Sequence, residues 1–168
     1  MVWGGMMSTN SVAGLTPAQI ATLALLEAPD KSGRQKAPIP GRIHLVKEIF
    51  AVHSTDLGKR LLPDLRFEPD NFGPFDETVF AALDELTDLG LVETVATAGR
   101  GEIRLTAKGE AFADPMWGRM KADVQGLITY VKVNYNHRSS NSVLHEIYSA
   151  FPEMTRNSIS PVAQKYRR

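Results

Sequence analysis

Residues 72–90 read FGPFDETVFAALDELTDLG, and this stretch decides the predicted fold. Its apolar residues recur at spacings of three and four, which predicts an amphipathic helix with one buried face. These apolar residues are Phe75, Val79, Ala82, Leu83 and Leu86. Pro74 precedes the helix, and Gly90 suits the position just past its end. We therefore expect one helix from about residue 76 to residue 88.

The polar face of this predicted helix is acidic and carries no Lys or Arg. A helix that reads DNA bases needs Arg, Lys, Asn or Gln on its exposed face, and carboxylates are repelled by phosphate. The charge therefore favours docking of a protein partner that has a basic surface, with a merely solvated acidic face as the alternative. The candidate docking residues are Asp76, Glu77, Asp84, Glu85 and Asp88.

The segments on both sides of this helix complete a recognisable order of elements. Helices are predicted over residues 17–28, 41–53 and 56–62, and strands over residues 91–95 and 102–105. Thr106 then suits the cap of a further helix. Helix, helix, helix, hairpin and helix is the order of a winged helix, and a short strand near Phe67 is a candidate third strand of the wing. We predict a mainly α chain with a small β-hairpin (α+β), with a winged-helix-like core over residues 15–114.

Residues 115–159 are predicted to form a C-terminal helical extension packed on that core. Its first helix, from Pro115 to about residue 135, carries an apolar stripe at spacings near 3.5 residues. The stripe comprises Trp117, Met120, Val124, Leu127, Ile128 and Val131. It either packs within the molecule or forms a homodimer seam through the helix 116–134. A final helix follows over about residues 143–151.

Both ends of the chain are expected to lie outside the folded part. Residues 160–168 form a basic segment that we predict to be a mobile tail, and residues 1–14 a disordered lead-in with alternative starts at Met1, Met6 and Met7. The N-terminus has neither the basic region nor the apolar core of a signal peptide, and the chain has no apolar run long enough for a membrane span. We predict a cytoplasmic protein without a membrane partner.

The charge of the 168-residue chain is balanced overall but unevenly distributed. The formal net charge is zero, which argues against a general nucleic-acid binder. Residues 61–98 hold nine acids against one base, whereas residues 121–168 hold seven bases against three acids. This asymmetry is consistent with a docking surface or with contact between the two regions.

No motif in the sequence indicates an enzyme, a cofactor or a metal site. The chain has no cysteine, and its four histidines show no metal-ligand spacing. The loop around His137, Arg138 and Ser139 contains a base, a guanidinium and a hydroxyl, but we interpret it as supplying a helix cap through Asn141 or Ser142. The expectation is a non-enzymatic protein with no cofactor and no metal.

Four short motifs carry a resemblance to a known family. They are GRIHLVK at residues 41–47, FGPF at 72–75, LTDLGLV at 86–92 and RLTAKG at 104–109. In this order and spacing they resemble the YwgA-like proteins of bacteria and archaea over roughly residues 41–159, and are more distantly similar to the Panacea antitoxin domain. The resemblance implies a small winged-helix-like cytosolic protein, sometimes encoded beside defence or toxin–antitoxin genes, without known catalytic residues. Asp76 stands where that family often has Ser, and both can cap a helix.

Two functions remain as expectations. The first is a non-enzymatic winged-helix adaptor or regulatory subunit, antitoxin-like or defence-associated, that binds a protein partner through the acidic helix. The alternative is a DNA-binding transcription regulator that contacts phosphates through the wing and the basic tail. The candidate nucleic-acid contacts of that alternative are Arg100, Arg104, Lys165, Arg167 and Arg168.

Overall fold

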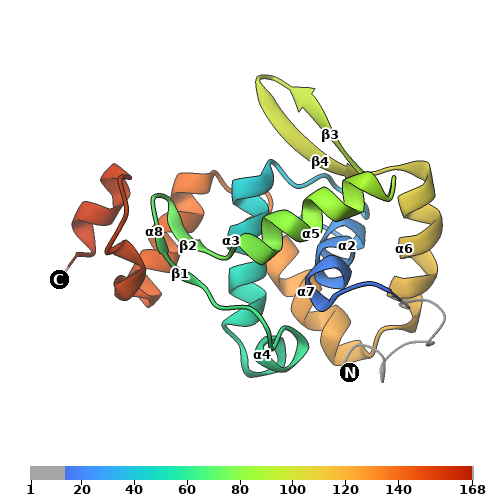
Figure 1. Ribbon diagram of the computed structural model, residues 1–168, viewed down its shortest axis with the longest axis horizontal. Coiled ribbons are helices and arrows are strands. Elements are labelled where there is room, and N and C mark those ends of the chain that lie inside the picture. Colours follow the sequence, from blue (N-terminus) through green and yellow to red (C-terminus); the bar gives the residue numbers. More distant parts are fainter. Residues whose placement is uncertain (1–13, 168) are drawn as a thin grey trace.

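The computed structural model describes residues 14–167, which form a mainly α-helical α+β fold with two small antiparallel sheets (Figure 1). The predicted disordered lead-in lies almost wholly outside the described residues, as does Arg168. No helix within the described part is long and apolar enough to cross a membrane. The elements are α2 (Pro17–Glu27), α3 (Arg42–His53), α4 (Asp56–Leu61), β1 (Glu68–Asp70), β2 (Gly73–Phe75), α5 (Glu77–Asp88), β3 (Val92–Thr97), β4 (Arg100–Leu105), α6 (Ala107–Arg119), α7 (Ala122–Tyr135), α8 (Ser140–Ala150) and the 3₁₀ helices η2 (Pro152–Thr155) and η3 (Pro161–Lys165).

Helix α2 forms the centre of the main core. Its start is the expected capping box, in which the Thr16 hydroxyl accepts from the Gln19 amide while the Gln19 side chain accepts from the Thr16 amide. Every residue of α2 after Pro17 is buried, because α5, α6 and α7 pack around it. Figure 1 shows α2 enclosed between these helices. A helix that is apolar on all sides is stable only in such an interior position.

Helix α5 and the hairpin that follows it form as the sequence predicts. Asp76 caps the helix by accepting a 2.8 Å hydrogen bond from the amide of Thr78. Four of the predicted apolar positions are buried: Val79, Ala82, Leu83 and Leu86. Strands β3 and β4 then pair in antiparallel register, and their turn is tighter than expected because Ala98 and Gly99 both adopt left-handed backbone angles. The order helix, hairpin, helix is thus present, and assignment to the winged-helix class stays a prediction.

The expected third strand of the wing is wrong. The segment after Phe67 folds back on itself, with β1 paired to β2, instead of joining β3 and β4. Instead, Ile39, in the segment between α2 and α3, forms an isolated antiparallel bridge with Ile103 of β4. Hydrogen bonds to main-chain carbonyls fix this segment: the side chain of Asn136 donates to Pro38, and the Lys132 ammonium donates to Ala37.

The helices after the hairpin break at a different place from the one predicted. Helix α6 continues through Pro115 to Arg119, since Ala113 and Met116 on either side of the proline are buried. The break falls at Met120, whose backbone is extended, and α7 begins two residues later. The predicted stripe mostly faces inward, with Met120, Val124, Ile128 and Val131 in the main core. This stripe is therefore covered by the protein's own helices.

A second, smaller core joins the C-terminal segment to α8. Phe50 of α3 meets Val143, Leu144, Ile147 and Tyr148 of α8, and Val162 and Ala163 of η3 are buried among them. The prediction of a mobile tail is therefore wrong for residues 160–167. Basic composition suggested a solvated end, but the apolar pair Val162 and Ala163 anchors η3 and holds the segment against α8.

Candidate functional site

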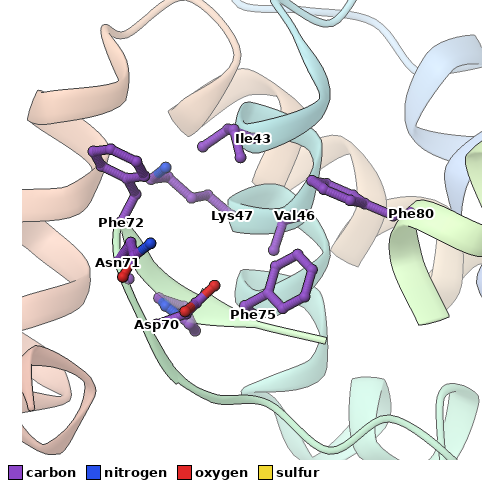
Figure 2. A pocket seen from close by; sticks show the side chains of 10 residues that line it. Ile43, Val46, Lys47, Asp70, Asn71, Phe72, Phe75 and Phe80 are labelled. Atoms are coloured by element: carbon purple, nitrogen blue, oxygen red, sulfur yellow. The ribbon is translucent and has the colours of Figure 1, made fainter. Parts of the chain in front are cut away.

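A small pocket lies where the hairpin β1–β2 crosses helix α3 beside the start of α5. Its volume is about 180 Å³, and its walls are mainly aromatic and aliphatic (Figure 2). The side chains that line it include Ile43, Val46, Lys47, Phe72, Phe75 and Phe80, with Asp70 and Asn71 at the hairpin turn. Two of the four motifs quoted above, residues 41–47 and 72–75, thus meet at this pocket. Sites that bind small molecules are commonly apolar with few polar groups, as this one is.

Lys47 is the one lysine of the pocket lining, and its surroundings are unusual for a cation. Only 2% of Lys47 is exposed. Figure 2 shows its side chain running from α3 with the amino group toward Phe72. No hydrogen bond or ion pair joins this amino group to another residue within 14–167. Burial lowers the pKa of Lys47 to about 8, because the ammonium loses water and no carboxylate offsets that loss.

The hairpin that closes the pocket is fixed in place from the C-terminal segment. Gly73 has a left-handed φ of +105°, and a β-carbon there would lie 2.7 Å from Leu144 of α8, so only glycine allows this approach. The carbonyl of Asn71 accepts from the amide of Ile159 at 2.9 Å and from the hydroxyl of Ser158 at 3.0 Å. The side chain of Asn157 donates to the carbonyl of Pro69. Residues distant in sequence therefore set the position of Phe72 and the pocket wall.

Three of the predicted acidic docking residues have structural partners. Asp76 is the cap of α5 and also accepts from the main-chain amide of Arg66. Asp84 lies 3.4 Å from Arg42, which also stacks on Phe80, and the carboxylate of Glu85 accepts from Gln19. The other two predicted docking residues, Glu77 and Asp88, are exposed and have no side-chain partner within the described chain.

The exposed acids form one surface along α5. Glu77, Asp84 and Asp88 are seven and four positions apart, which places them on the same face of the helix, and Glu85 lies beside them. We call these four residues the acidic face. Pocket and acidic face are neighbours, because Phe80 of α5 lines the pocket one turn before Asp84.

The four predicted nucleic-acid contacts within residues 14–167 are not brought together, and the fifth, Arg168, lies outside the described residues. Arg104 pairs with Glu102 at 3.0 Å, and Arg167 donates to the main-chain carbonyls of Thr155 and Ser158. Lys165 belongs to η3 of the C-terminal segment, which Figure 1 shows at a different part of the molecule from the hairpin β3–β4. Arg100, by contrast, lies with Arg42 beside a hollow of about 430 Å³ at the N-termini of α3 and α8.

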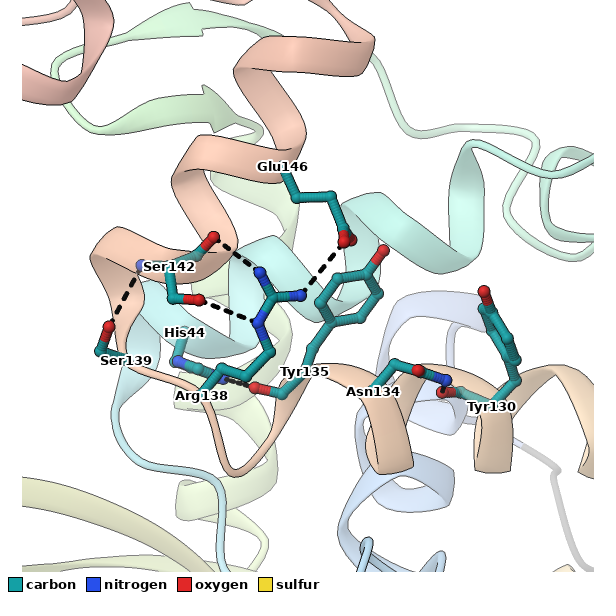
Figure 3. Close-up of polar contacts among 8 residues, drawn as sticks. All are labelled: His44, Tyr130, Asn134, Tyr135, Arg138, Ser139, Ser142 and Glu146. Carbon is teal, nitrogen blue, oxygen red and sulfur yellow. Dashed lines mark hydrogen bonds and ion pairs between the residues drawn. The ribbon is translucent and has the colours of Figure 1, made fainter.

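The loop between α7 and α8 has a structural role. Ser139, rather than Asn141 or Ser142, caps α8 by accepting from the amide of Ser142 at 3.1 Å, because the helix begins two or three residues earlier than predicted. Arg138 donates to the side chain and the main chain of Ser142 and pairs with Glu146 (Figure 3). These contacts engage the guanidinium of Arg138 and the hydroxyls of Ser139 and Ser142, whereas the exposed His137 takes no part in them.

A second group of buried ionisable side chains lies in the interior behind the pocket. Lys132 of α7 is fully buried and donates to the carbonyls of Leu25 and Ala37. Burial raises the pKa of Glu48 and lowers that of Lys132, and the charge of each partly opposes the shift of the other. The Nε2 atom of His44 donates to the carbonyl of Tyr135 at 2.9 Å (Figure 3). The same nitrogen lies 3.4 Å from the carboxyl of Glu48. Burial lowers the pKa of His44 to about 4.

Sequence reasoning singled out the acidic face but missed Lys47. The sequence did contain a signal for this residue, because Lys47 ends the motif at residues 41–47, and the motif at residues 72–75 lies in the same predicted core. What was missing was the fold-back of residues 68–75, which covers α3 and removes Lys47 from water. Among residues 14–167 no group of three or more His, Cys, Asp or Glu is arranged to hold a metal ion.

Comparison with known proteins assigns the chain to no family. No protein-family model matches the chain, and no curated protein does.

Proposed function

We propose that this protein is a non-enzymatic binding module, a winged-helix-like adaptor or regulatory subunit, that docks a protein partner through the acidic face of α5. The partner is expected to present Lys and Arg side chains. The resemblance to the YwgA-like and Panacea-type proteins supports an antitoxin-like or defence-associated role. We propose that the protein performs this role in the cytoplasm.

The observation that carries the proposal is the arrangement of charge on α5. Four exposed carboxylates lie along about three turns of one rigid helix, and Glu77 and Asp88 at its two ends have no side-chain partner within the described chain. Charges arranged in this way raise the rate of association with a basic partner and repel the phosphates of nucleic acid. Asp84 and Glu85 are held by Arg42 and Gln19, so the middle of the surface is already ordered before a partner binds.

The alternative is a nucleic-acid-binding regulator, and one observation favours it. Arg42 and Arg100 flank the hollow at the N-termini of α3 and α8, and helix N-termini together with arginines are suited to phosphate. The proximity of Asp84 to Arg42 reduces the positive charge available there.

The first experiment is affinity purification of the tagged protein from its native cells, with and without nuclease. A stoichiometric protein partner that survives nuclease supports the docking function. Nucleic acid that co-elutes and is lost on nuclease treatment supports the alternative instead. The partner's affinity is then measured by direct titration.

The surface is tested by charge reversal at the two ends of α5. Glu77→Lys with Asp88→Lys leaves the contacts of Asp84 and Glu85 intact and should weaken binding of a basic partner. The two positions are about 16 Å apart along the helix, so they sample its length. The matched control is Glu110→Lys with Glu153→Lys, which makes the same change of charge at exposed acids on α6 and η2. Equal weakening by both double variants would contradict α5 as the docking surface.

A further inference from the structure

The pocket beside α5 contains a lysine in an apolar surrounding. Lys47 is 2% exposed, lines the pocket, and has no hydrogen-bond or ion-pair partner within residues 14–167. An ammonium covered to this extent loses much of its hydration, and no group of the described chain compensates for that loss. An apolar residue of similar length would fill the same space without that loss. A lysine at this position is therefore explained better by a ligand than by the fold.

The charge and shape of the pocket specify the ligand's chemistry. An ammonium in a site of low polarity selects an anion, and a carboxylate can pair with it through a charge-assisted hydrogen bond. The walls around it are Ile43, Val46, Phe72, Phe75 and Phe80, and the Phe75 and Phe80 rings pack edge to face, 5.0 Å apart. These walls select an apolar body. The volume of about 180 Å³ is below that of a drug-sized site, which suits one aromatic ring or a branched aliphatic chain.

The pocket entrance points to a small molecule. Phe72 lies at the hairpin turn with 51% of its surface exposed, while Lys47 lies behind it almost completely covered. A carboxylate that reaches Lys47 must therefore lie within the pocket, behind Phe72. A small acid can enter this space more readily than a side chain on the surface of a partner protein.

We propose that this pocket binds a small carboxylic acid, whose aromatic or branched aliphatic body contacts Phe72, Phe75 and Phe80 and whose carboxylate pairs with the amino group of Lys47. Asp70, at the hairpin turn, is the acidic residue of that lining, so it disfavours ligands with a second negative charge. The site adjoins the acidic face but contains none of its four residues, and it would make the protein responsive to a metabolite-sized acid.

The test is a titration of the full chain with a panel of small acids, monitored by protein NMR chemical shifts. The probes are benzoate, phenylacetate, 3-phenylpropionate, indole-3-acetate and isovalerate, each compared with its neutral primary amide. At least one acid should bind in fast exchange, about tenfold or more tighter than its amide, because the charge-assisted bond is lost in the amide. Absence of binding by the whole panel up to about 10 mM would overturn the proposal.

Two variants assign the contacts. Lys47→Met keeps the length of the side chain and removes its charge, so affinity for the acid should fall about tenfold or more while affinity for the amide stays the same. The control Lys59→Met makes the same change at an exposed lysine of α4 and should leave both affinities unchanged. Preference for the acid over the amide that persists in Lys47→Met would exclude pairing with Lys47.

A second variant, Phe72→Ala, keeps the proposal testable if Lys47→Met does not fold. Phe72→Ala removes an exposed ring from the pocket wall and should weaken the acid and its amide by the same factor, since only apolar contact is lost. No change in either affinity would contradict the placement of the ligand's body. The variant with Glu77→Lys and Asp88→Lys should bind the acid like wild type, so failure of this site and failure of the docking function are distinguishable.

Discussion

Ser158 and Asn71 are 87 positions apart in the chain, and the hydroxyl of Ser158 donates a 3.0 Å hydrogen bond to the main-chain carbonyl of Asn71. The same hydroxyl accepts from the phenol of buried Tyr148 at 2.7 Å and from the amide of Ser160. One side chain therefore connects α8, the C-terminal segment and the hairpin that carries the pocket wall.

Ser158→Ala should destabilise the protein by about 1–3 kcal/mol, because the buried Tyr148 phenol loses its acceptor. Urea unfolding monitored by circular dichroism measures this change. Ser149→Ala on the exposed side of α8 is the control and should stay within about 0.5 kcal/mol of wild type. Equal free energies of unfolding for the two variants would show that the connection through Ser158 is not formed.

Burial of His44 should make the free energy of unfolding fall more, or rise less, between about pH 6.5 and pH 4 than in a variant without this histidine. The pKa of His44 is lowered from 6.5 to about 4 by burial. In this window the unfolded chain binds a proton at His44 and the folded protein does not, so acid favours unfolding, by about 3 kcal/mol for the full shift. Glu48, whose pKa burial raises, acts in the opposite direction, so the prediction concerns the difference between variants.

His44→Gln removes this titration and keeps a donor for the carbonyl of Tyr135. The free energy of unfolding of His44→Gln should therefore depend less on pH between 6.5 and 4 than that of wild type. His137→Gln, at an exposed histidine, is the matched control and should keep the wild-type dependence. Parallel pH profiles for His44→Gln and wild type would contradict a neutral, buried His44.

Lys132→Met should destabilise the protein by about 1–3 kcal/mol, since the carbonyls of Leu25 and Ala37 lose their donor. The variant also removes the positive charge that opposes the rise in the pKa of Glu48. Adding Glu48→Leu should recover at least about 1 kcal/mol, because the buried carboxyl that Lys132 opposed is then absent. Denaturant titrations of the two single variants, the double variant and the exposed control Lys121→Met measure the coupling. Strict additivity of the two single effects would mean that the residues do not interact.

Gly126→Ala should stabilise the protein by about 0.5–1 kcal/mol, because alanine favours helix and the position within α7 has open space around it. Gly99→Ala is the contrasting variant. It also meets open space, but its φ of +79° is left-handed, so it should cost about 1 kcal/mol. Thermal unfolding midpoints that move in the same direction for both variants would contradict the left-handed backbone of Gly99 in the turn between β3 and β4.

Local signals in the sequence were sufficient for the starts of α2, α5 and α6. Thr16, Asp76 and Thr106 each cap the helix that follows them, through a hydrogen bond to an amide two or three residues later. Such contacts are encoded within a few positions, and so the starts of these helices could be predicted without knowledge of the tertiary structure.

Features that depend on distant contacts could not be predicted in this way. The hairpin β1–β2 pairs Pro69 with Pro74, a composition that argues against strands, and the C-terminal segment stabilises it from 87 positions away. Pro115 marks a break on local grounds, yet burial of its neighbours keeps α6 continuous.

The two parts of the candidate site differ in the same way, since one depends on local sequence and the other on tertiary contacts. The acidic face is visible in the sequence because charge on a helix is a local pattern. Lys47 appears in the sequence as one ordinary lysine of an amphipathic helix. It becomes buried only because residues 68–75 cover it, and its relation to Phe72 and Phe80 exists only in the folded chain.

Helix α2 has a consequence for the order of events during biosynthesis. It leaves the ribosome before the elements that enclose it, and α5, α6 and α7 follow it by some fifty to over a hundred positions. The ammonium that binds the carbonyl of Leu25 belongs to Lys132, which is translated 107 residues later. A nascent chain halted before α5 thus exposes an apolar helix without the three helices that enclose it, a target for chaperones and for self-aggregation. Among the described helices, the earliest to be synthesised reaches its final environment only when most of the chain is complete.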